Sequence, residues 1–327
     1  MNIAILDDTL NVVERLPAFA KLKHHDVTVI HEHVTDLADL ASRLQDAEAI
    51  VLNRERTPIP ARLIERLPRL AFISQTGRST PHIDLEACAA RGIAVSAGGR
   101  APLATVELTW ALILASRRRV VLEANALRDG RWQTGLGTTV RGRTLGILGY
   151  GTIGAAVGRI ASSFGAGVLV WGREGSLARA TADGLPTARS ADALFETADI
   201  VSVHVQLTTD TTGLIRASHL ARMKPSALFV NTSRAGLVEP GALLAALRNG
   251  RPGFAALDVF DEEPFDGRAS PLASMPNVLC SPHMGHVESD AFEMFYDIAF
   301  DQVLAFCAGT PINVVCDGRG GVARPAR

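Results

Sequence analysis

The sequence predicts an α/β protein with two doubly wound parallel-sheet domains, one inserted into the other. The chain has 327 residues, more than a single hydrophobic core usually organises. Short apolar runs alternate with segments of helical spacing along nearly its whole length, as expected for parallel strands joined by helices. A glycine-rich turn also stands between one apolar run and the helix predicted to follow it.

The first hundred residues alternate predicted strands and helices. Strands are expected at residues 3–6, 27–30, 49–52, 70–74 and 93–95, and helices at 12–22, 37–44, 61–67 and 85–90. Repeated strand-then-helix order is typical of a parallel sheet covered by helices. This region is therefore predicted to form one compact unit that ends near residue 97.

Two loops of this unit follow predicted strands at the carboxyl edge, where open α/β sheets usually bind ligands. One contains Thr76, Gly77 and Arg78. Its backbone amides could hold a small anion, and Arg78 adds positive charge. From this segment alone, a plain strand-to-helix loop is the favoured interpretation. Residues 53–56 raise the same question, and a solvated charged turn also explains them.

Glycine and proline residues at 98–102 mark a boundary. Pro102 suits the first turn of a helix, and an apolar segment of helical spacing runs from residue 103 to about 115. The three arginines at 117–119 are more consistent with charges at a helix C-terminus than with a phosphate site.

The glycine-rich turn follows a predicted strand at residues 145–148. Gly149, Gly151 and Gly154 have the spacing G-x-G-x-x-G, with Thr152 and Ile153 inside it. The first glycine permits a tight turn, the second lets the backbone approach a pyrophosphate, and the third lets the helix pack on the strand. A glycine-rich turn without a ligand is the alternative. The flanking strand and helix favour a dinucleotide site of the Rossmann type.

The next predicted strand, residues 168–171, ends in Gly172 and Arg173. Dinucleotide sites usually have an acidic residue at this strand tip, where it binds the ribose hydroxyls. Here Glu174 comes only after the turn. Arg173 at the tip therefore favours NADP over NAD, although stacking on adenine or a solvated side chain would also fit.

The rest of the chain continues the alternation. Strands are expected at 199–205, 228–231, 253–259 and 278–280, and helices at 190–198, 219–223 and 241–248. Together with the two preceding strands they make a doubly wound sheet of at least six strands. A long helix at 290–307 and an extended piece at 311–315 follow, and the glycine- and arginine-rich tail, 318–327, is expected to be disordered.

The order of these motifs resembles the D-isomer-specific 2-hydroxyacid dehydrogenase family over nearly the whole chain. The matching segments are Gly149 to Gly154, the strand with His204, and residues 231–234, 258–264 and 281–283. The resemblance implies an oxidoreductase that transfers a hydride between NAD or NADP and a 2-keto or D-2-hydroxy acid. It also implies a homodimer, for which the helix at 103–115 is the candidate contact.

The resemblance also implies the catalytic residues. Arg234 matches the arginine that holds the substrate carboxylate and keto oxygen, His283 matches the acid/base, and Glu263 matches the carboxylate paired with that histidine. A fixed guanidinium and a proton donor suit the negative charge that grows on the carbonyl oxygen. Taken singly, these residues could be a capping arginine, a surface histidine and part of an acidic turn.

Further contacts follow from the same resemblance. Asp258 matches the aspartate that contacts the nicotinamide carboxamide, and His204 and Thr232 are expected beside the cofactor. The loop of Thr76, Gly77 and Arg78 matches the cradle for the substrate carboxylate. His283 and His286 could form a metal pair, but no third ligand is evident, so no metal is expected.

We therefore predict a flavodoxin-like substrate domain, residues 1–98 with 289–327, and a Rossmann cofactor domain, residues 99–288. Gln206 and Ala235 stand where the family usually has proline and glycine, and the substrate stays open. A dinucleotide-sensing corepressor-like protein and a formate-type dehydrogenase are the alternatives. Glu263 beside the histidine fits a hydroxy acid better than formate.

The composition excludes other partners. With 47% hydrophobic residues, 20% charged residues and a formal net charge of −1, neither a nucleic-acid nor a membrane partner is expected. No apolar run has the ~18 residues of a membrane span, and the N-terminus does not have a signal-peptide pattern. The four cysteines form no C-x-x-C pair, which fits the reducing cytoplasm.

Overall fold

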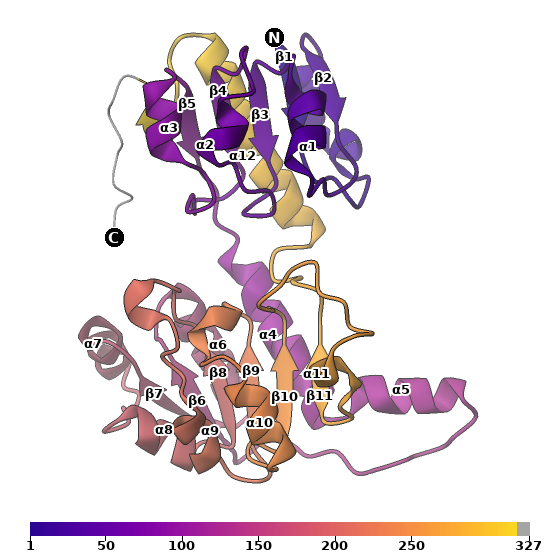
Figure 1. The fold of residues 1–327 in the computed structure, drawn as a ribbon. Helices are drawn as coiled ribbons and strands as arrows, with labels where there is room; N and C mark the ends of the chain where they lie inside the picture. Colours follow the sequence, from indigo (N-terminus) through magenta and orange to yellow (C-terminus); the bar gives the residue numbers. More distant parts are fainter. Residues whose placement is uncertain (319–327) are drawn as a thin grey trace. The chain divides into compact units, whose positions relative to one another are not determined.

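The computed structural model describes residues 1–318. The chain divides into two compact units, each with a six-stranded sheet (Figure 1). Unit 1 consists of Met1–Arg100 and the described residues from Glu288, and unit 2 consists of Ala101–Val287. The tail predicted to be disordered lies, apart from Gly318, outside the described residues. The predicted fold class of two parallel-sheet α/β domains is confirmed.

The sheet of unit 1 has the order β2-β1-β3-β4-β5-β12. Its strands are β1 (Asn2–Ile5), β2 (Asp26–Val29), β3 (Ala49–Leu52), β4 (Phe72–Gln75), β5 (Ala94–Ala97) and β12 (Val314–Asp317). The first five are parallel and have the flavodoxin-like order. The extended piece predicted near residue 311 is β12, which joins β5 in antiparallel orientation.

Helices cover both faces of this sheet. The helices are α1 (Leu37–Leu44), α2 (Ala61–Ile64), α3 (Leu85–Ala90) and α12 (Ser289–Cys307). The first three share one core with the strands, whereas α12 lies on the other face, where Phe306 stacks on Phe72 of β4 at 4.5 Å. The helix predicted at 12–22 is instead two short 3₁₀ helices, Val13–Arg15 and Pro17–Leu22, because Leu16 before Pro17 is extended.

The sheet of unit 2 has the order β7-β6-β8-β9-β10-β11 and is parallel throughout. Its strands are β6 (Thr144–Leu148), β7 (Gly167–Trp171), β8 (Ile200–Val203), β9 (Leu228–Asn231), β10 (Phe254–Leu257) and β11 (Val278–Cys280). A single bridge from Thr187 to Val170 extends the β7 edge. With Thr187 in the place of a third strand, the order matches the Rossmann pattern.

Two layers of helices enclose this sheet. The helices are α4 (Pro102–Arg117), α5 (Val120–Arg128), α6 (Thr152–Ser163), α7 (Glu174–Ala182), α8 (Ala191–Thr197), α9 (Ala217–Arg222), α10 (Ala242–Arg248) and α11 (Pro271–Ser274). Helices α4 and α6 share one core with the sheet, and α8, α9 and α10 share the other. Pro102 is in the first turn of α4, as predicted. No helix within residues 1–318 is long and apolar enough to cross a bilayer.

Candidate active site

The glycine-rich turn joins β6 to α6, as the sequence predicts. Gly149 has a φ of +93°, and a Cβ there would lie 2.7 Å from the His204 carbonyl oxygen. A Cβ at Gly154 would overlap the Gly149 carbonyl oxygen, whereas one at Gly151 would meet nothing within 4 Å. The outer glycines are thus required by the fold itself. The open space at Gly151, in front of the first turn of α6, fits a pyrophosphate.

The first turn of α6 contains the two other predicted contacts of this loop. Gly151 is the N-cap of α6, Thr152 is its first residue, and Ile153 follows. Thr152 is exposed and Ile153 is half-buried. The first amides of a helix have no partner within it and carry its positive dipole end. This turn can therefore hold the dinucleotide.

At the tip of β7, Gly172 and Arg173 lead directly into α7. Arg173 is the N-cap of α7 and is exposed, and Glu174 is the first residue of the helix. A Cβ at Gly172 would lie 3.5 Å from the Cα of Gly149. The tip of β7 is therefore close to the glycine loop, as the strand tip that contacts the ribose is in dinucleotide sites.

His204 follows β8 and lies against the glycine loop through its carbonyl group. A hydrogen bond of 2.9 Å joins its Nε2 to the Oγ of Ser202. Burial lowers the pKa of His204 to about 4, so the ring is neutral at physiological pH. Thr232, after β9, is buried and shares a hydrogen bond of 2.9 Å with the hydroxyl of Thr109 on α4.

Asp258 follows β10 and is completely buried. Its Oδ1 accepts hydrogen bonds from the hydroxyl of Ser281 (2.6 Å) and the N–H of Met284 (2.8 Å), and its Oδ2 accepts one from the N–H of Gly285 (3.0 Å). Burial raises the pKa of Asp258 above its ordinary value, although these donors and the charge of His283 act to lower it. The carboxylate thus anchors the turn that carries His283.

His283 and Glu263 form a close pair. The Nδ1–H of His283 donates to Oε2 of Glu263 at 2.5 Å, and Oε1 of Glu263 accepts the N–H of Phe260 at 3.0 Å. Burial alone would raise the pKa of Glu263, but the bond from His283 and the charges of His283 and Arg234 bring it below its ordinary value. The pair leaves Nε2 of His283 available for proton transfer.

Arg234 lies three residues beyond the end of β9 and is the N-cap of a short 3₁₀ helix, Ala235–Leu237. Its NH1 donates to the carbonyl oxygen of Ser233 at 2.7 Å, and its own carbonyl oxygen accepts from the side chain of Asn231 at 3.0 Å. Its charge acts on Glu263. Within unit 2, the structure therefore brings together Arg234, Glu263 and His283, with Asp258 behind the histidine turn.

The predicted carboxylate cradle lies in unit 1. Thr76 and Gly77 are buried, whereas Arg78 is exposed. The side-chain amide of Gln75 donates to the carbonyl oxygen of Ser79 at 3.0 Å and so closes the loop. This loop is therefore ordered by side-chain contacts rather than being a plain connection.

The sequence left residues 53–56 open between an anion-binding loop and a solvated charged turn, and the structure places Arg54 against the loop of Thr76 and Gly77. Arg54 has a φ of +59°, its N–H donates to the hydroxyl of Thr76 at 3.0 Å, and its guanidinium lies over the ring of Phe295 at 5.3 Å. A Cβ at Gly77 would come within 2.9 Å of its NH1. The available signal was its position after β3, at the same sheet edge as the cradle.

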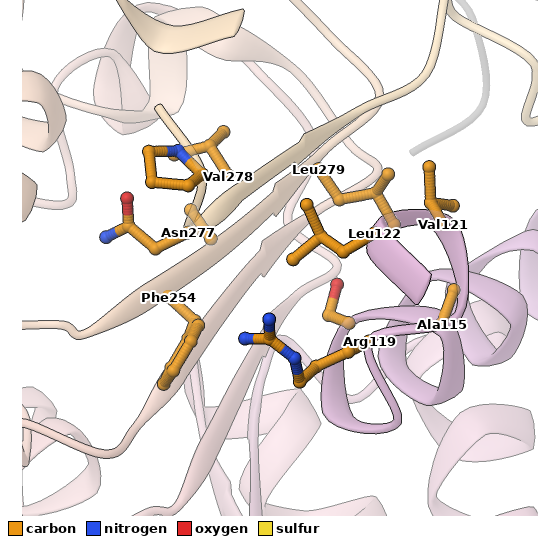
Figure 2. A pocket seen from close by; sticks show the side chains of 11 residues that line it. Ala115, Arg119, Val121, Leu122, Phe254, Asn277, Val278 and Leu279 are labelled. Carbon is orange, nitrogen blue, oxygen red and sulfur yellow. The ribbon is translucent and has the colours of Figure 1, made fainter. Parts of the chain in front are cut away.

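Other features lie away from this site. A surface hollow in unit 2 is lined by the end of α4, by α5 and by β10 and β11 (Figure 2). Within the described residues 1–318, no three His, Cys, Asp or Glu side chains are grouped so as to hold a metal ion.

Comparison with known proteins settles the family. A protein-family model matches residues 110–285, and it describes the NAD-binding domain of D-isomer specific 2-hydroxyacid dehydrogenases. The chain belongs to the D-isomer-specific 2-hydroxyacid dehydrogenase family. It is therefore an oxidoreductase of the class that transfers a hydride between a nicotinamide cofactor and a 2-hydroxy or 2-keto acid.

Individual members of the family agree with this. A glyoxylate reductase from Aeropyrum pernix is 37% identical over 90% of each chain. A glycerate dehydrogenase from Methylorubrum extorquens is 34% identical over 85% of this chain and 88% of its own. The structure of a phosphoglycerate oxidoreductase from Vibrio cholerae is 44% identical, with a TM-score of 0.92 over 94% of this chain and 99% of that one. These relatives favour a dehydrogenase over the corepressor-like and formate-type alternatives.

Proposed function

We propose that the protein reduces a 2-keto acid to the D-2-hydroxy acid, with His283 as the proton donor. The observation that carries this proposal is the His283–Glu263 bond of 2.5 Å, which occupies Nδ1 and leaves Nε2 available. Arg234, whose charge acts on Glu263, provides the guanidinium for the substrate. A nicotinamide cofactor, when bound, supplies the hydride.

The side chains have distinct tasks. Arg234 binds the carboxylate and the keto oxygen, since its planar fork can donate two parallel hydrogen bonds. As negative charge grows on the keto oxygen, the guanidinium stabilises it and Nε2 of His283 delivers a proton. Glu263 accepts the hydrogen bond from Nδ1 and so holds the ring in one orientation. The backbone of Thr76, Gly77 and Arg78 is the expected cradle for the substrate carboxylate in the substrate domain, residues 1–98 with 289–327.

The cofactor contacts come from the domain of residues 99–288. Gly149, Gly151, Thr152, Ile153 and Gly154 are proposed to hold the pyrophosphate. Asp258 is proposed to accept a hydrogen bond from the carboxamide, because Oδ2 accepts one bond in the structure and a carboxylate oxygen has room for two. 

Residues beside these contacts complete the cofactor site. His204 and Thr232 are proposed to line it. Gly172 removes bulk at the strand tip, and Arg173 favours NADP over NAD because its charge complements the extra phosphate.

We further propose a cytoplasmic homodimer. All four cysteines, Cys88, Cys280, Cys307 and Cys316, are unpaired thiols in the structure, as suits a reducing compartment. The predicted dimer contact, α4, already buries Val106, Trp110 and Ile113 within unit 2. We therefore assign the contact to α5 and the segment after it.

The exposed apolar side chains favour α5. Trp132 is 76% exposed and Leu136 is 96% exposed, and both lie in a segment that the side chain of Glu123 ties to α5 through Thr134. The hollow of Figure 2 is lined in part by α5, and Leu122 and Phe254 are in its wall. Apolar surface of this kind usually marks an interface.

Replacement of the proposed proton donor tests the function. His283→Asn should lower kcat for 2-keto acids such as glyoxylate and hydroxypyruvate by about 100-fold or more, and nucleotide affinity should stay within about twofold. Steady-state kinetics and nucleotide fluorescence titration measure the two effects. His24→Asn, at an exposed site in unit 1, is the matched control. A fully active His283→Asn enzyme would refute the assignment.

A further inference from the structure

The side chain of Arg179, on α7, is held at the glycine loop. Its Nε donates to the carbonyl oxygen of Tyr150 at 3.0 Å, and its NH2 lies 3.5 Å from the Oγ of Ser176. Tyr150 is fixed in turn, because it is buried and its hydroxyl donates to Asp183 at 2.7 Å. The Arg179 guanidinium therefore has one position beside the residue between Gly149 and Gly151.

The same guanidinium adjoins the tip of β7. A Cβ at Gly172 would lie 3.2 Å from the Oγ of Ser176 and 3.5 Å from the Cα of Gly149. Gly172, Ser176 and Arg179 thus surround one point at the end of the strand. In dinucleotide sites this strand tip contacts the adenosine ribose and its 2′ substituent.

The arginines at this point are not paired with acids in the part of the chain that the structure describes. Arg173 and Arg179 are both exposed, and within residues 1–318 neither forms an ion pair with a carboxylate, whereas Arg43, Arg119 and Arg131 on the same protein do. Asp183, the acid nearest along α7, accepts the Tyr150 hydroxyl instead. Two guanidinium groups and a hydroxyl are therefore available at the strand tip.

From this arrangement we infer that Arg179 is a specificity-determining residue that binds the 2′-phosphate of NADP(H), together with Ser176 and Arg173. The inference rests on the proposed function, which it deepens at the cofactor site. The bond from Nε to Tyr150 orients the guanidinium so that NH1 and NH2 can donate in parallel to a phosphate. Because the side chain is already fixed, little conformational entropy is lost on binding.

Glu174 is the competing group. It is exposed in the first turn of α7, and a carboxylate there could accept the ribose hydroxyls of NAD and repel a phosphate. Within residues 1–318 neither Glu174 nor Asp183 forms an ion pair with Arg173 or Arg179, since Asp183 accepts the Tyr150 hydroxyl, so both guanidinium groups can bind a phosphate. NADPH is therefore expected to bind more tightly than NADH.

The test is a fluorescence titration of the full-length protein with NADPH and with NADH. Arg179→Met keeps most of the length of the side chain and removes its charge. It should raise the Kd for NADPH about tenfold or more, as for the loss of a charge-assisted contact to phosphate, and leave the Kd for NADH within about twofold. In this variant, adenosine 2′,5′-bisphosphate should compete less well with the bound nucleotide, whereas competition by 5′-AMP should not change.

Controls separate the possible causes. Arg248→Met, in the last turn of α10, should change neither Kd, and the melting temperature of Arg179→Met should stay near that of the wild type. An equal loss of NADPH and NADH affinity would overturn the inference, since Arg179 would then only support the glycine loop. Tighter binding of NADH than of NADPH by the wild type would also overturn it. If neither nucleotide binds the wild type, the proposed function itself fails.

Discussion

Asp258 stabilises the histidine turn through three donors that are close along the chain. The Ser281 hydroxyl and the amides of Met284 and Gly285 all point to it, and His283, between them, has a φ of +50°. Positive φ is unfavourable for a residue with a side chain, so the turn depends on these bonds. The conformation of His283, the proposed proton donor, is therefore set by a buried carboxylate that follows a different strand.

The residue types of the site could be predicted from the sequence, but their connections could not. Arg234, Glu263 and His283 stand in segments that the motif order identifies, and the structure brings them together in unit 2. The anchoring by Asp258 depends on backbone geometry that no residue pattern shows. The contacts of Arg54 could not be predicted either, because its partners, Thr76 and Phe295, are far from it in the sequence.

His204 should make stability depend on pH. Its pKa of about 4 lies below the usual 6.5 because of burial, so the unfolded chain takes up a proton at a higher pH than the folded protein. The contribution of neutral His204 to the free energy of unfolding is therefore fully present above pH 6.5 and is lost as the pH falls towards 4. The loss is expected to reach roughly 3 kcal/mol.

Urea unfolding of the wild type and of His204→Gln at pH 7, 5 and 4 measures this pH-dependent contribution to the free energy of unfolding. Glutamine can still bond to Ser202 but does not titrate, so the variant should lose less stability between pH 7 and pH 4. His24→Gln, at an exposed position, should behave like the wild type. Identical pH dependence in His204→Gln and the wild type would contradict the prediction.

At the scale of the element, two glycines of the turn between β6 and α6 have different roles, since one is needed for folding and the other for nucleotide binding. Gly154→Ala should destabilise the protein by about 2–3 kcal/mol, since the new methyl group would overlap the Gly149 carbonyl oxygen. Gly151→Ala should leave stability within about 0.5 kcal/mol, because nothing lies within 4 Å of the new methyl group. It should instead raise the Kd for the nucleotide about tenfold or more, and a tenfold change corresponds to about 1.4 kcal/mol of binding free energy.

Thermal unfolding and nucleotide titration of the two variants measure these effects. The prediction fails if Gly151→Ala binds nucleotide as tightly as the wild type, since the pyrophosphate would then lie elsewhere. It also fails if Gly154→Ala is as stable as the wild type.

Several elements with buried residues were predictable to the residue, whereas the exposed helix α5 was not predicted. The helices α1 and α3 and the strands β3 and β9 have the predicted bounds, because the pattern of apolar residues reports which side chains face a core. The helix α5 was not predicted, because Ala126 is its one buried residue and its valines and leucines face outward. The spacing of apolar residues in α5 therefore does not indicate which face of the helix is buried.

At the scale of the whole molecule, the alternation of strands and helices predicts two parallel sheets, and only the resemblance to the family implies the order of their strands. The local alternation of strand and helix does not say that β1 lies between β2 and β3, or that Thr187 alone extends the β7 edge. Nor does it show that β12 is antiparallel. These features depend on pairings between distant segments.

The proposed homodimer gives a prediction at the same scale. Light scattering of the wild type should give about twice the monomer mass of 34.7 kDa. Leu136→Asp should raise the dimer dissociation constant about tenfold or more, because burying an unpaired carboxylate is costly. Leu103→Asp is the matched control, since Leu103 is 68% exposed at the start of α4. If only Leu103→Asp dissociates the dimer, the contact is on α4 instead.

The strand β12 and the helix α12 have a consequence for biosynthesis. Both belong to unit 1, but both are translated after the whole of unit 2. When the first hundred residues leave the ribosome, β5 is still an unpaired sheet edge and Phe72 does not yet have Phe306 to cover it. Such edges and apolar faces are prone to aggregation in nascent chains. The unit synthesised first is thus the last that can be completed, and its β5 edge stays open to intermolecular pairing until residue 317 has been translated.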